Sequence, residues 1–529
     1  MTELLPDLVF QSALRTPDAP ALSFGDKTLS YGELAGQIRQ SAASFVRMGI
    51  GKSERVAIYL EKRLENVVAM FGAAAAGAVF VPVNPLLRPQ QVRHILRDCN
   101  VRILVTSESR LASLSDILSD CPDLNSVVSV DGPPAAELAH IDGLGWSDLF
   151  EKASAGTVPH SAIDRDMAAI IYTSGSTGLP KGVVLSHRNM VAGARSVSQY
   201  LENTPDDRIL SVLPLSFDAG LSQLTTAFNV GASVILMNFL LPKDVVVMAG
   251  KVRATGIAGV PPLWNQLAGL EWPAEAAESV RYFTNTGGHM PRPTLDRLRR
   301  AMPNAAPYLM YGLTEAFRST YLPPSEVDNR PDSMGRAIPN AEILVVRGDG
   351  SLCAPGEPGE LVHRGALVAL GYWNDPDRTS ERFKPAPGQD PALPITELAV
   401  WSGDTVRMDE DGFLYFVGRQ DEMIKTSGYR VSPTEVEEII YASGLVSEAV
   451  AIGVPHETQG QAIVIVATPP PEKPADEAAV LAACRKELPP FMVPQRVVLR
   501  DALPRNPNGK IDRKRIASEL EALFKDCAA

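Results

Sequence analysis

The sequence contains few cysteines, no excess of basic residues and no long apolar segment, and each absence excludes a class of function. Only five of its 529 residues are cysteines (Cys99, Cys121, Cys353, Cys484 and Cys527), and no two of them form a Cys-x-x-Cys pair. Neither a zinc site nor a disulfide framework is therefore expected, and a reducing cytoplasm fits this composition.

The balance of charge argues against a general nucleic-acid-binding protein. The chain carries 50 basic and 62 acidic residues, which gives a formal net charge of −12. A net negative surface does not neutralise a run of phosphates, although one local site can still bind a single anionic ligand.

No segment is suited to cross a membrane. Residues 67–83 are uncharged, but they include Gly72, Gly77 and Pro82 and fall short of the ~20 residues that a bilayer requires. A buried helix followed by a buried strand is the better interpretation. The N-terminus lacks the basic start and long apolar core of a signal peptide, so a cytoplasmic protein is expected.

The length predicts two or more domains. Helical and strand patterns alternate over the first part of the chain and resume at residues 209–213, 233–237 and 257–260, which predicts a layered α/β fold with a mostly parallel sheet. Short strand-like runs over about 335–418 predict a β-rich subdomain. A boundary near residues 418–421 then separates a large N-terminal domain, 1–418, from a small, mobile α+β domain, 419–529.

The C-terminal domain contains a recognisable helix start. Ser432 is a candidate N-cap, Pro433 suits the first helical position, and Glu435 would complete a capping box. Another short helix is expected near residues 512–523.

The most informative segment is the loop Thr-Ser-Gly-Ser-Thr-Gly-Leu-Pro-Lys-Gly, residues 173–182, between predicted strands at 167–173 and 182–186. Its glycines let backbone N–H groups converge on an anion, its hydroxyls add donors, and Lys181 adds a positive charge. The loop lacks the Gly-Lys-Ser/Thr ending of a Walker A loop, and it is not a Gly-x-Ser-x-Gly nucleophile elbow. It is suited to cradle a polyphosphate. Considered alone, a flexible Gly/Ser hairpin is the alternative.

Together with five further segments, this loop resembles the adenylate-forming (AMP-binding) superfamily of acyl-CoA synthetases, peptide-synthetase adenylation domains and luciferases. The segments lie at residues 311–315 (Tyr-Gly-Leu-Thr-Glu), 402–404 (Ser-Gly-Asp), 418–421 (Gly-Arg-Gln-Asp), 425–430 and 506–510. They follow the family's order, and the resemblance covers nearly the whole chain. Ser402 replaces the usual threonine and keeps its hydroxyl.

The resemblance implies roles for individual residues. Lys510, Thr314, Glu315 and Lys181 would be catalytic, with Glu315 holding Mg²⁺. The ATP site would comprise Thr173, Ser174, Gly175, Ser176, Thr177, Gly178, Gly287, Gly288, Tyr311, Gly312, Asp404 and Arg419. Asp421 would be the hinge between the domains, and Lys425, Gly428 and Arg430 would serve the thiolation step. The acyl pocket would be lined by Asp218, Ser222, Gly259, Asn285, Met310 and Arg318.

The implied activity is ATP-dependent formation of an acyl-adenylate, followed by transfer of the acyl group to a thiol, either that of CoA or that of carrier-protein phosphopantetheine. The segments at residues 309–321 and 365–373 resemble those of acyl-CoA ligases associated with bacterial exosortase A systems, which implies an acyl carrier protein as a possible partner. A stand-alone aminoacyl adenylation enzyme is the alternative. An enzyme that stops at the adenylate is disfavoured by the intact 425–430 segment. An inactive scaffold is disfavoured because Lys181, Glu315, Asp404 and Lys510 are all present.

The identity of the acid depends on three polar residues. Asp218 either pairs with the ammonium of an amino acid or caps a helix near Ala219, and the sequence supports both interpretations equally. Arg318 could meet a second carboxylate or a polar head group, or it could pair with Glu315 or Asp218. Because Arg318 and Asn285 are unsuited to a long fatty chain, a small or medium polar acid is expected.

Overall fold

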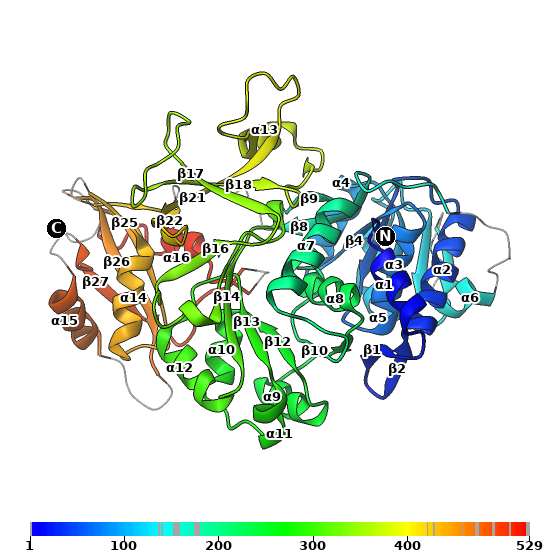
Figure 1. Ribbon diagram of the computed structural model, residues 1–529, viewed down its shortest axis with the longest axis horizontal. Coiled ribbons are helices and arrows are strands. Elements are labelled where there is room, and N and C mark those ends of the chain that lie inside the picture. Colours follow the sequence, from blue (N-terminus) through cyan, green and yellow to red (C-terminus); the bar gives the residue numbers. More distant parts are fainter. Residues whose placement is uncertain are drawn as a thin grey trace.

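The computed structural model describes residues 3–524 except 136–137, 139–140, 152–158, 174–179, 420–421, 427–428, 457–458, 471–475, 489–491 and 507–508. Three sheets follow one another across the molecule, with the N-terminal part at one end and the C-terminal domain at the other (Figure 1). The α/β fold class predicted from the sequence is confirmed.

The first sheet has eight strands, six of which form a parallel array. Its spatial order is β19 (Gly371–Tyr372), β9 (Lys181–Ser186), β8 (Met167–Thr173), β4 (Val79–Pro82), β3 (Arg55–Tyr59), β5 (Val101–Thr106), β6 (Ser126–Ser129) and β7 (Asp142–Gly145). Helices α4 (Pro89–Asp98) and α5 (Glu108–Leu118) pack on one face of this sheet, and α6 (Trp146–Glu151) follows β7.

The second sheet has fourteen strands, and its middle strands β10 to β14 are parallel. Its order is β17 (Ala341–Val346), β18 (Gly359–Gly365), β21 (Leu398–Met408), β22 (Leu414–Arg419), β16 (Ser333–Ala337), β15 (Thr320–Leu322), β14 (Ala306–Tyr311), β13 (Tyr282–Asn285), β12 (Gly256–Gly259), β10 (Arg208–Ser211), β11 (Ser233–Leu236), β1 (Pro20–Phe24) and β2 (Lys27–Ser30), with β20 (Phe383–Pro385) beside β21. The predicted β-rich region therefore continues the parallel strands through β16.

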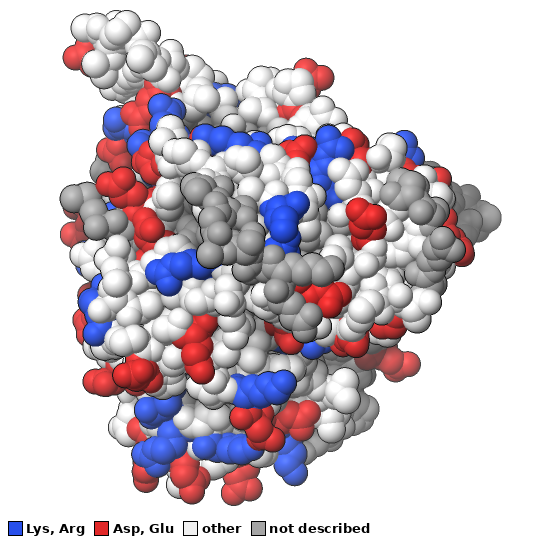
Figure 2. All heavy atoms as spheres, turned by 90° about the vertical axis from the view of Figure 1, so that its right-hand side faces the viewer, with Lys and Arg blue, Asp and Glu red and all other residues white. Residues whose placement is uncertain are grey.

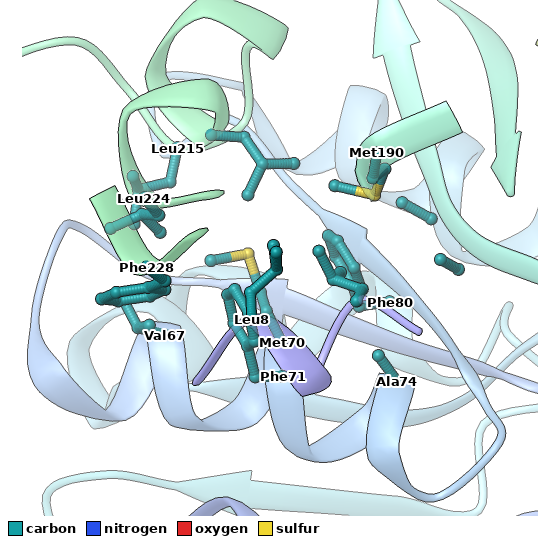
Figure 3. Packing of buried hydrophobic residues seen from close by; sticks show 14 of the residues in the cluster. Leu8, Val67, Met70, Phe71, Ala74, Phe80, Met190, Leu215, Leu224 and Phe228 are labelled. Atoms are coloured by element: carbon teal, nitrogen blue, oxygen red, sulfur yellow. The ribbon is translucent and has the colours of Figure 1, made fainter. Parts of the chain in front are cut away.

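Two groups of helices cover this second sheet. On one face lie α9 (Pro242–Lys251), α10 (Pro261–Leu267), α11 (Ala274–Ser279) and α12 (Arg292–Ala301). Between the two large sheets lie α1 (Asp7–Arg15), α2 (Tyr31–Arg47), α3 (Leu64–Ala75), α7 (His187–Tyr200) and α8 (Asp218–Val230). Phe71 of α3 and Phe228 of α8 meet edge to face at 5.5 Å in this shared core (Figure 3). The uncharged stretch 67–83 is buried as helix α3 and strand β4, as its composition predicts.

The C-terminal domain has its own five-stranded sheet. It comprises β24 (Tyr429–Val431), β23 (Ile424–Thr426), β26 (Gly460–Thr468), β25 (Glu448–His456) and β27 (Arg496–Leu499), covered by α14 (Pro433–Ser443), α15 (Glu477–Glu487) and α16 (Arg513–Glu519). The predicted start of α14 is confirmed, since Ser432 is at the N-cap position and Pro433 is the first helical residue. The capping bond is not formed: the Ser432 side chain accepts no hydrogen bond from the helix, and its Oγ lies near Gly418 of β22. The last helix also ends earlier than expected, at Glu519.

On the side of the molecule drawn in Figure 2, basic and acidic side chains are interspersed, so neither sign of charge dominates that face. Within the described ranges, no helix combines the length and apolar character needed to span a bilayer.

Phe317, in the segment that follows β14, has a strained backbone and packs against the interior helix α7. Phe317 has φ +56°, in the left-handed region that a bulky side chain rarely adopts, and it is fully buried. Its ring lies against Gly193 of α7, where an added Cβ would stand 2.7 Å from Cδ1. The absence of a side chain at Gly193 therefore fixes the backbone on which Glu315 and Arg318 are carried.

Gly193→Ala should lower the free energy of unfolding by about 1–3 kcal/mol, because the new methyl group overlaps the Phe317 ring. Gly36→Ala in α2 is the matched control: a Cβ there meets no atom within 4 Å, and the change should stabilise by about 0.5–1 kcal/mol. Thermal unfolding of both variants measures the difference. Equal melting temperatures would contradict this role of Gly193.

Candidate active site

The phosphate-loop motif connects two paired strands. Thr173 ends β8, Lys181 begins β9, and the two residues face each other in an antiparallel pair. The hydroxyl of Thr173 is buried and has no hydrogen-bond partner among the described residues. The intervening residues Ser174, Gly175, Ser176, Thr177 and Gly178 lie outside the described residues, so their phosphate contacts remain a prediction.

Glu315 lies at the centre of a buried polar cluster. Its Oε1 accepts hydrogen bonds from Lys181 Nζ at 3.0 Å and from the Tyr372 hydroxyl at 2.5 Å. Lys181 also donates to the Tyr372 oxygen at 2.7 Å. The three side chains come from β9, from the 3₁₀ turn Thr314–Ala316 and from β19, which pairs with β9. The cluster therefore links the two large sheets.

The charges of this cluster follow from its contacts. Burial alone would raise the pKa of Glu315, but the charge of Lys181 and the hydrogen bonds from Tyr372 and Lys181 outweigh it, so the pKa is lowered. Burial and the neighbouring Glu315 carboxylate raise the pKa of Tyr372, so its phenol stays protonated and donates. Glu315 is therefore an ionised carboxylate inside the protein, where Lys181 is its cationic partner.

Such a carboxylate fits Mg²⁺. Magnesium in nucleotide sites is usually held by one or two carboxylates together with phosphate oxygens and water. Within the described part of the chain, no three acidic, histidine or cysteine side chains gather into a cluster that could hold a metal by themselves. A cation at Glu315 would therefore take its other ligands from a bound nucleotide.

The residues predicted to hold the adenosine lie on three strands of the fourteen-stranded sheet: Tyr311 ends β14, Asp404 lies in β21, and Arg419 ends β22. The Tyr311 hydroxyl donates a hydrogen bond to Asp404 Oδ2, and Asp404 is buried. Asp404 stands opposite Arg419 in the β21–β22 pair. Gly312 approaches the backbone of Arg318, since an added Cβ would lie 3.2 Å from its Cα.

The glycine loop after β13 is held open by Asn285. Asn285 is buried, and its Nδ2 donates to the Gly288 carbonyl at 2.9 Å, while Gly287 has φ +78°. This conformation suits glycine and leaves room for a long side chain from the C-terminal domain. A Cβ added at Gly287 would lie 3.7 Å from Cε of Lys510. The Lys510 side chain therefore lies against Gly287 of the N-terminal domain, although more than two hundred residues separate the two in sequence.

Lys510 is carried by a tight turn. The backbone of Asn506 donates to the Lys510 carbonyl at 2.8 Å, and the Lys510 N–H donates to the Asn506 side chain at 3.1 Å. Asp512 follows and caps α16. The turn is thus anchored to a helix of the C-terminal domain, so movement of that domain moves Lys510.

The buried Arg318 and the partly buried Asp218 form an ion pair, one of the alternatives that the sequence left open. Arg318 Nη1 lies 3.2 Å from Asp218 Oδ2 and donates to the Phe317 carbonyl, while Asp218 Oδ1 accepts from the Ala219 N–H at 2.7 Å. Asp218 is the first residue of α8. Each carboxylate oxygen of Asp218 therefore already has one polar contact, and Arg318 pairs with Asp218 and not with Glu315.

The remaining predicted pocket residues separate into two groups. Ser222, Met310 and Arg318 line one cavity. Gly259 lies instead against Trp264, whose indole would be 2.6 Å from an added Cβ, and Asn285 supports the glycine loop. Of the hinge and thiolation residues, Asp421 and Gly428 lie outside the described residues, while Lys425 and Arg430 face each other in the β23–β24 pair.

Sequence motifs assigned no role to Tyr372. Its only local signal is the preceding Gly371, which has φ +129° and whose missing side chain admits Thr379 of α13 (Pro376–Arg382). Its function depends on the pairing of β19 with β9, a contact between segments nearly two hundred residues apart.

Comparison with known proteins agrees with this geometry. The AMP-binding enzyme family model matches residues 9–373, and the AMP-binding enzyme C-terminal domain model matches residues 435–510. The L-proline–[L-prolyl-carrier protein] ligase of Pseudomonas fluorescens is 30% identical over 98% of this chain and 100% of its own length. A long-chain-fatty-acid–CoA ligase of Escherichia coli is 29% identical over 97% of this chain and 94% of its own length.

Two further matches show how widely the fold is used. A linear gramicidin synthase of Brevibacillus parabrevis is 30% identical over 95% of this chain, which spans only 9% of that protein. The structure of ATP-bound MatB from Rhodopseudomonas palustris aligns with a TM-score of 0.87 and 26% identity, covering 99% of this chain and 100% of that one. The chain therefore belongs to the AMP-binding enzyme family and is an AMP-forming acid–thiol ligase.

Proposed function

We propose that this ligase activates a small or medium polar carboxylic acid and that Lys510, Glu315, Lys181 and Thr314 carry the adenylation step. The observation that supports these roles most directly is the position of Lys510. Its side chain comes from the C-terminal domain and reaches the glycine loop at Gly287, which follows β13 of the N-terminal domain.

The first step needs no nucleophile from the protein; it needs the acid and ATP to be held in position. A carboxylate is ionised at neutral pH and can attack the α-phosphorus of ATP directly, with pyrophosphate leaving. The protein must hold two anions together and offset the charge that develops. The Lys510 ammonium and donors from residues 174–178 and Thr314 would supply that field. Mg²⁺, when bound at Glu315, would neutralise phosphate charge. Lys181 must then leave the Glu315 carboxylate and turn to the phosphates.

The second step exchanges AMP for a thiol. We expect the C-terminal domain to swing about Asp421, which withdraws Lys510 and brings the segment around Gly428 to the reacting centre. Either CoA or the phosphopantetheine of a carrier protein would supply the thiol. Pyrophosphate exchange across a panel of acids, followed by addition of CoA or a loaded carrier protein, identifies both the acid and the acceptor.

The aminoacyl alternative has less support. An α-ammonium group at Asp218 would have to share this carboxylate with Arg318, which already neutralises its charge. Displacing Arg318 would leave a buried guanidinium unpaired, at a cost of several kcal/mol. Amino acids should therefore be poorer substrates than acids of similar size that lack an ammonium group.

Lys510→Ala should reduce ATP–pyrophosphate exchange by about 10²–10³-fold, the effect expected when one preorganised cationic donor is removed. Thioester formation from supplied acyl-adenylate should be preserved. Lys514→Ala, an exposed lysine on α16, is the control for loss of charge in this domain. Normal exchange in Lys510→Ala would show that the assigned role is wrong.

Tyr372→Phe should raise the Mg²⁺ concentration needed for half-maximal exchange and lower the rate about tenfold, since a hydrogen bond to a charged group contributes about 1.5–3 kcal/mol. The ring remains to pack against Phe383, so the fold should be preserved. A Mg²⁺ titration of both proteins measures the shift. An unchanged Mg²⁺ requirement would contradict a role of Tyr372 in Mg²⁺ binding.

A further inference from the structure

A narrow cavity lies between helices α7 and α8 and the sheet strands β10, β12, β13 and β14. Its free space is about 30 Å³, enough for about two water molecules. Pockets for larger organic ligands typically measure about 300–1,000 Å³. A long alkyl chain therefore does not fit without a substantial rearrangement of the buried side chains.

The strands give the cavity a direction. Gly259 and Asn285 are paired at the carboxyl ends of β12 and β13, near the glycine loop that Lys510 approaches. Gly256 and Tyr282 are paired at the opposite ends of the same strands, and both line the cavity. Three residue steps along a parallel strand span about 10 Å. Tyr282 is thus at the far end of the cavity, away from the reacting centre.

The Tyr282 ring closes that far end. It crosses the backbone of Gly256 so closely that an added Cβ would lie 2.4 Å from its Cζ. Its hydroxyl accepts a hydrogen bond from Asn203 Nδ2 at 3.0 Å, and its ring meets Tyr308 edge to face at 6.1 Å. The ring is therefore fixed from two sides.

Helix α8 contributes polar side chains to the cavity wall. Ser222 and Thr226 both line the cavity and are four residues apart, so they share one face of the helix. Thr226 Oγ1 is buried and has no hydrogen-bond partner among the described residues. Leaving such a group unpaired costs about 1–3 kcal/mol. An oxygen on the tail of a bound acid would pair with it.

We infer that this cavity is the acyl site for a short acid whose tail carries an oxygen (a hydroxyl, a ketone or a second carboxyl group) and that Tyr282 sets the length limit. The inference rests on the proposed function. Thr226 exchanges a hydrogen bond with the tail oxygen at the far end of the cavity, and the Tyr282 ring stops longer chains.

Pyrophosphate exchange with unbranched acids of increasing length tests the limit. The wild-type rate should be highest with short acids and fall sharply as the chain lengthens, and Tyr282→Leu should move that limit to longer acids. Tyr282→Phe keeps the ring and should keep the limit. A folded Tyr282→Leu with the wild-type length profile would overturn the inference.

A second variant tests the polar wall independently, in case Tyr282→Leu does not fold. The wild type should prefer hydroxy, keto and dicarboxylic acids to unsubstituted acids of equal length, and Thr226→Val should reduce this preference about tenfold in kcat/KM. An unchanged preference would overturn the role of Thr226. If none of the acids supported pyrophosphate exchange, the proposed function itself would be contradicted. Fastest exchange with long unbranched acids would leave that function intact and overturn only the pocket inference.

Discussion

The buried carboxylate of Glu315 is the constraint on which the site depends. An ionised carboxylate can be buried only if cations or hydrogen bonds compensate it, and here Lys181 and Tyr372 do so. Because these partners come from the eight-stranded sheet and Glu315 from the fourteen-stranded one, compensating one charge also fixes how the two layers meet. A cation arriving with a nucleotide would replace Lys181 and free it for the phosphates.

A second, partly buried ion pair arranges the proposed acyl end of the site. Asp218 and Arg318 neutralise each other, and Phe317, strained and held against Gly193, sets the backbone between Glu315 and Arg318. The carboxylate proposed to hold Mg²⁺ and the guanidinium of the Asp218 pair are therefore three residues apart on one short segment. A change of packing at Gly193 would disturb both the nucleotide and the acid.

Local sequence patterns predicted much of this structure. The alternation of helical and strand patterns predicted β10, β11 and β12, and the glycine-rich loop with Lys181 was predicted to connect the strands that form β8 and β9. The start of α14 at Ser432 and Pro433 was also predicted, but not the side-chain conformation of Ser432, whose Oγ lies near Gly418 of another strand. Tyr372 and Tyr282 were missed because their roles depend on strand pairing over long distances, which no local pattern encodes. The pairing of Arg318 was left open for the same reason.

The acid is expected to attack the α-phosphorus of ATP before it leaves as a thioester, and every role assigned above depends on that attack. The direct test uses an accepted acid whose carboxylate oxygens carry a heavy-oxygen label. One labelled oxygen should appear in AMP, with release of unlabelled pyrophosphate. Label in inorganic phosphate, accompanied by ADP, would mean attack at the γ-phosphorus and would contradict this mechanism.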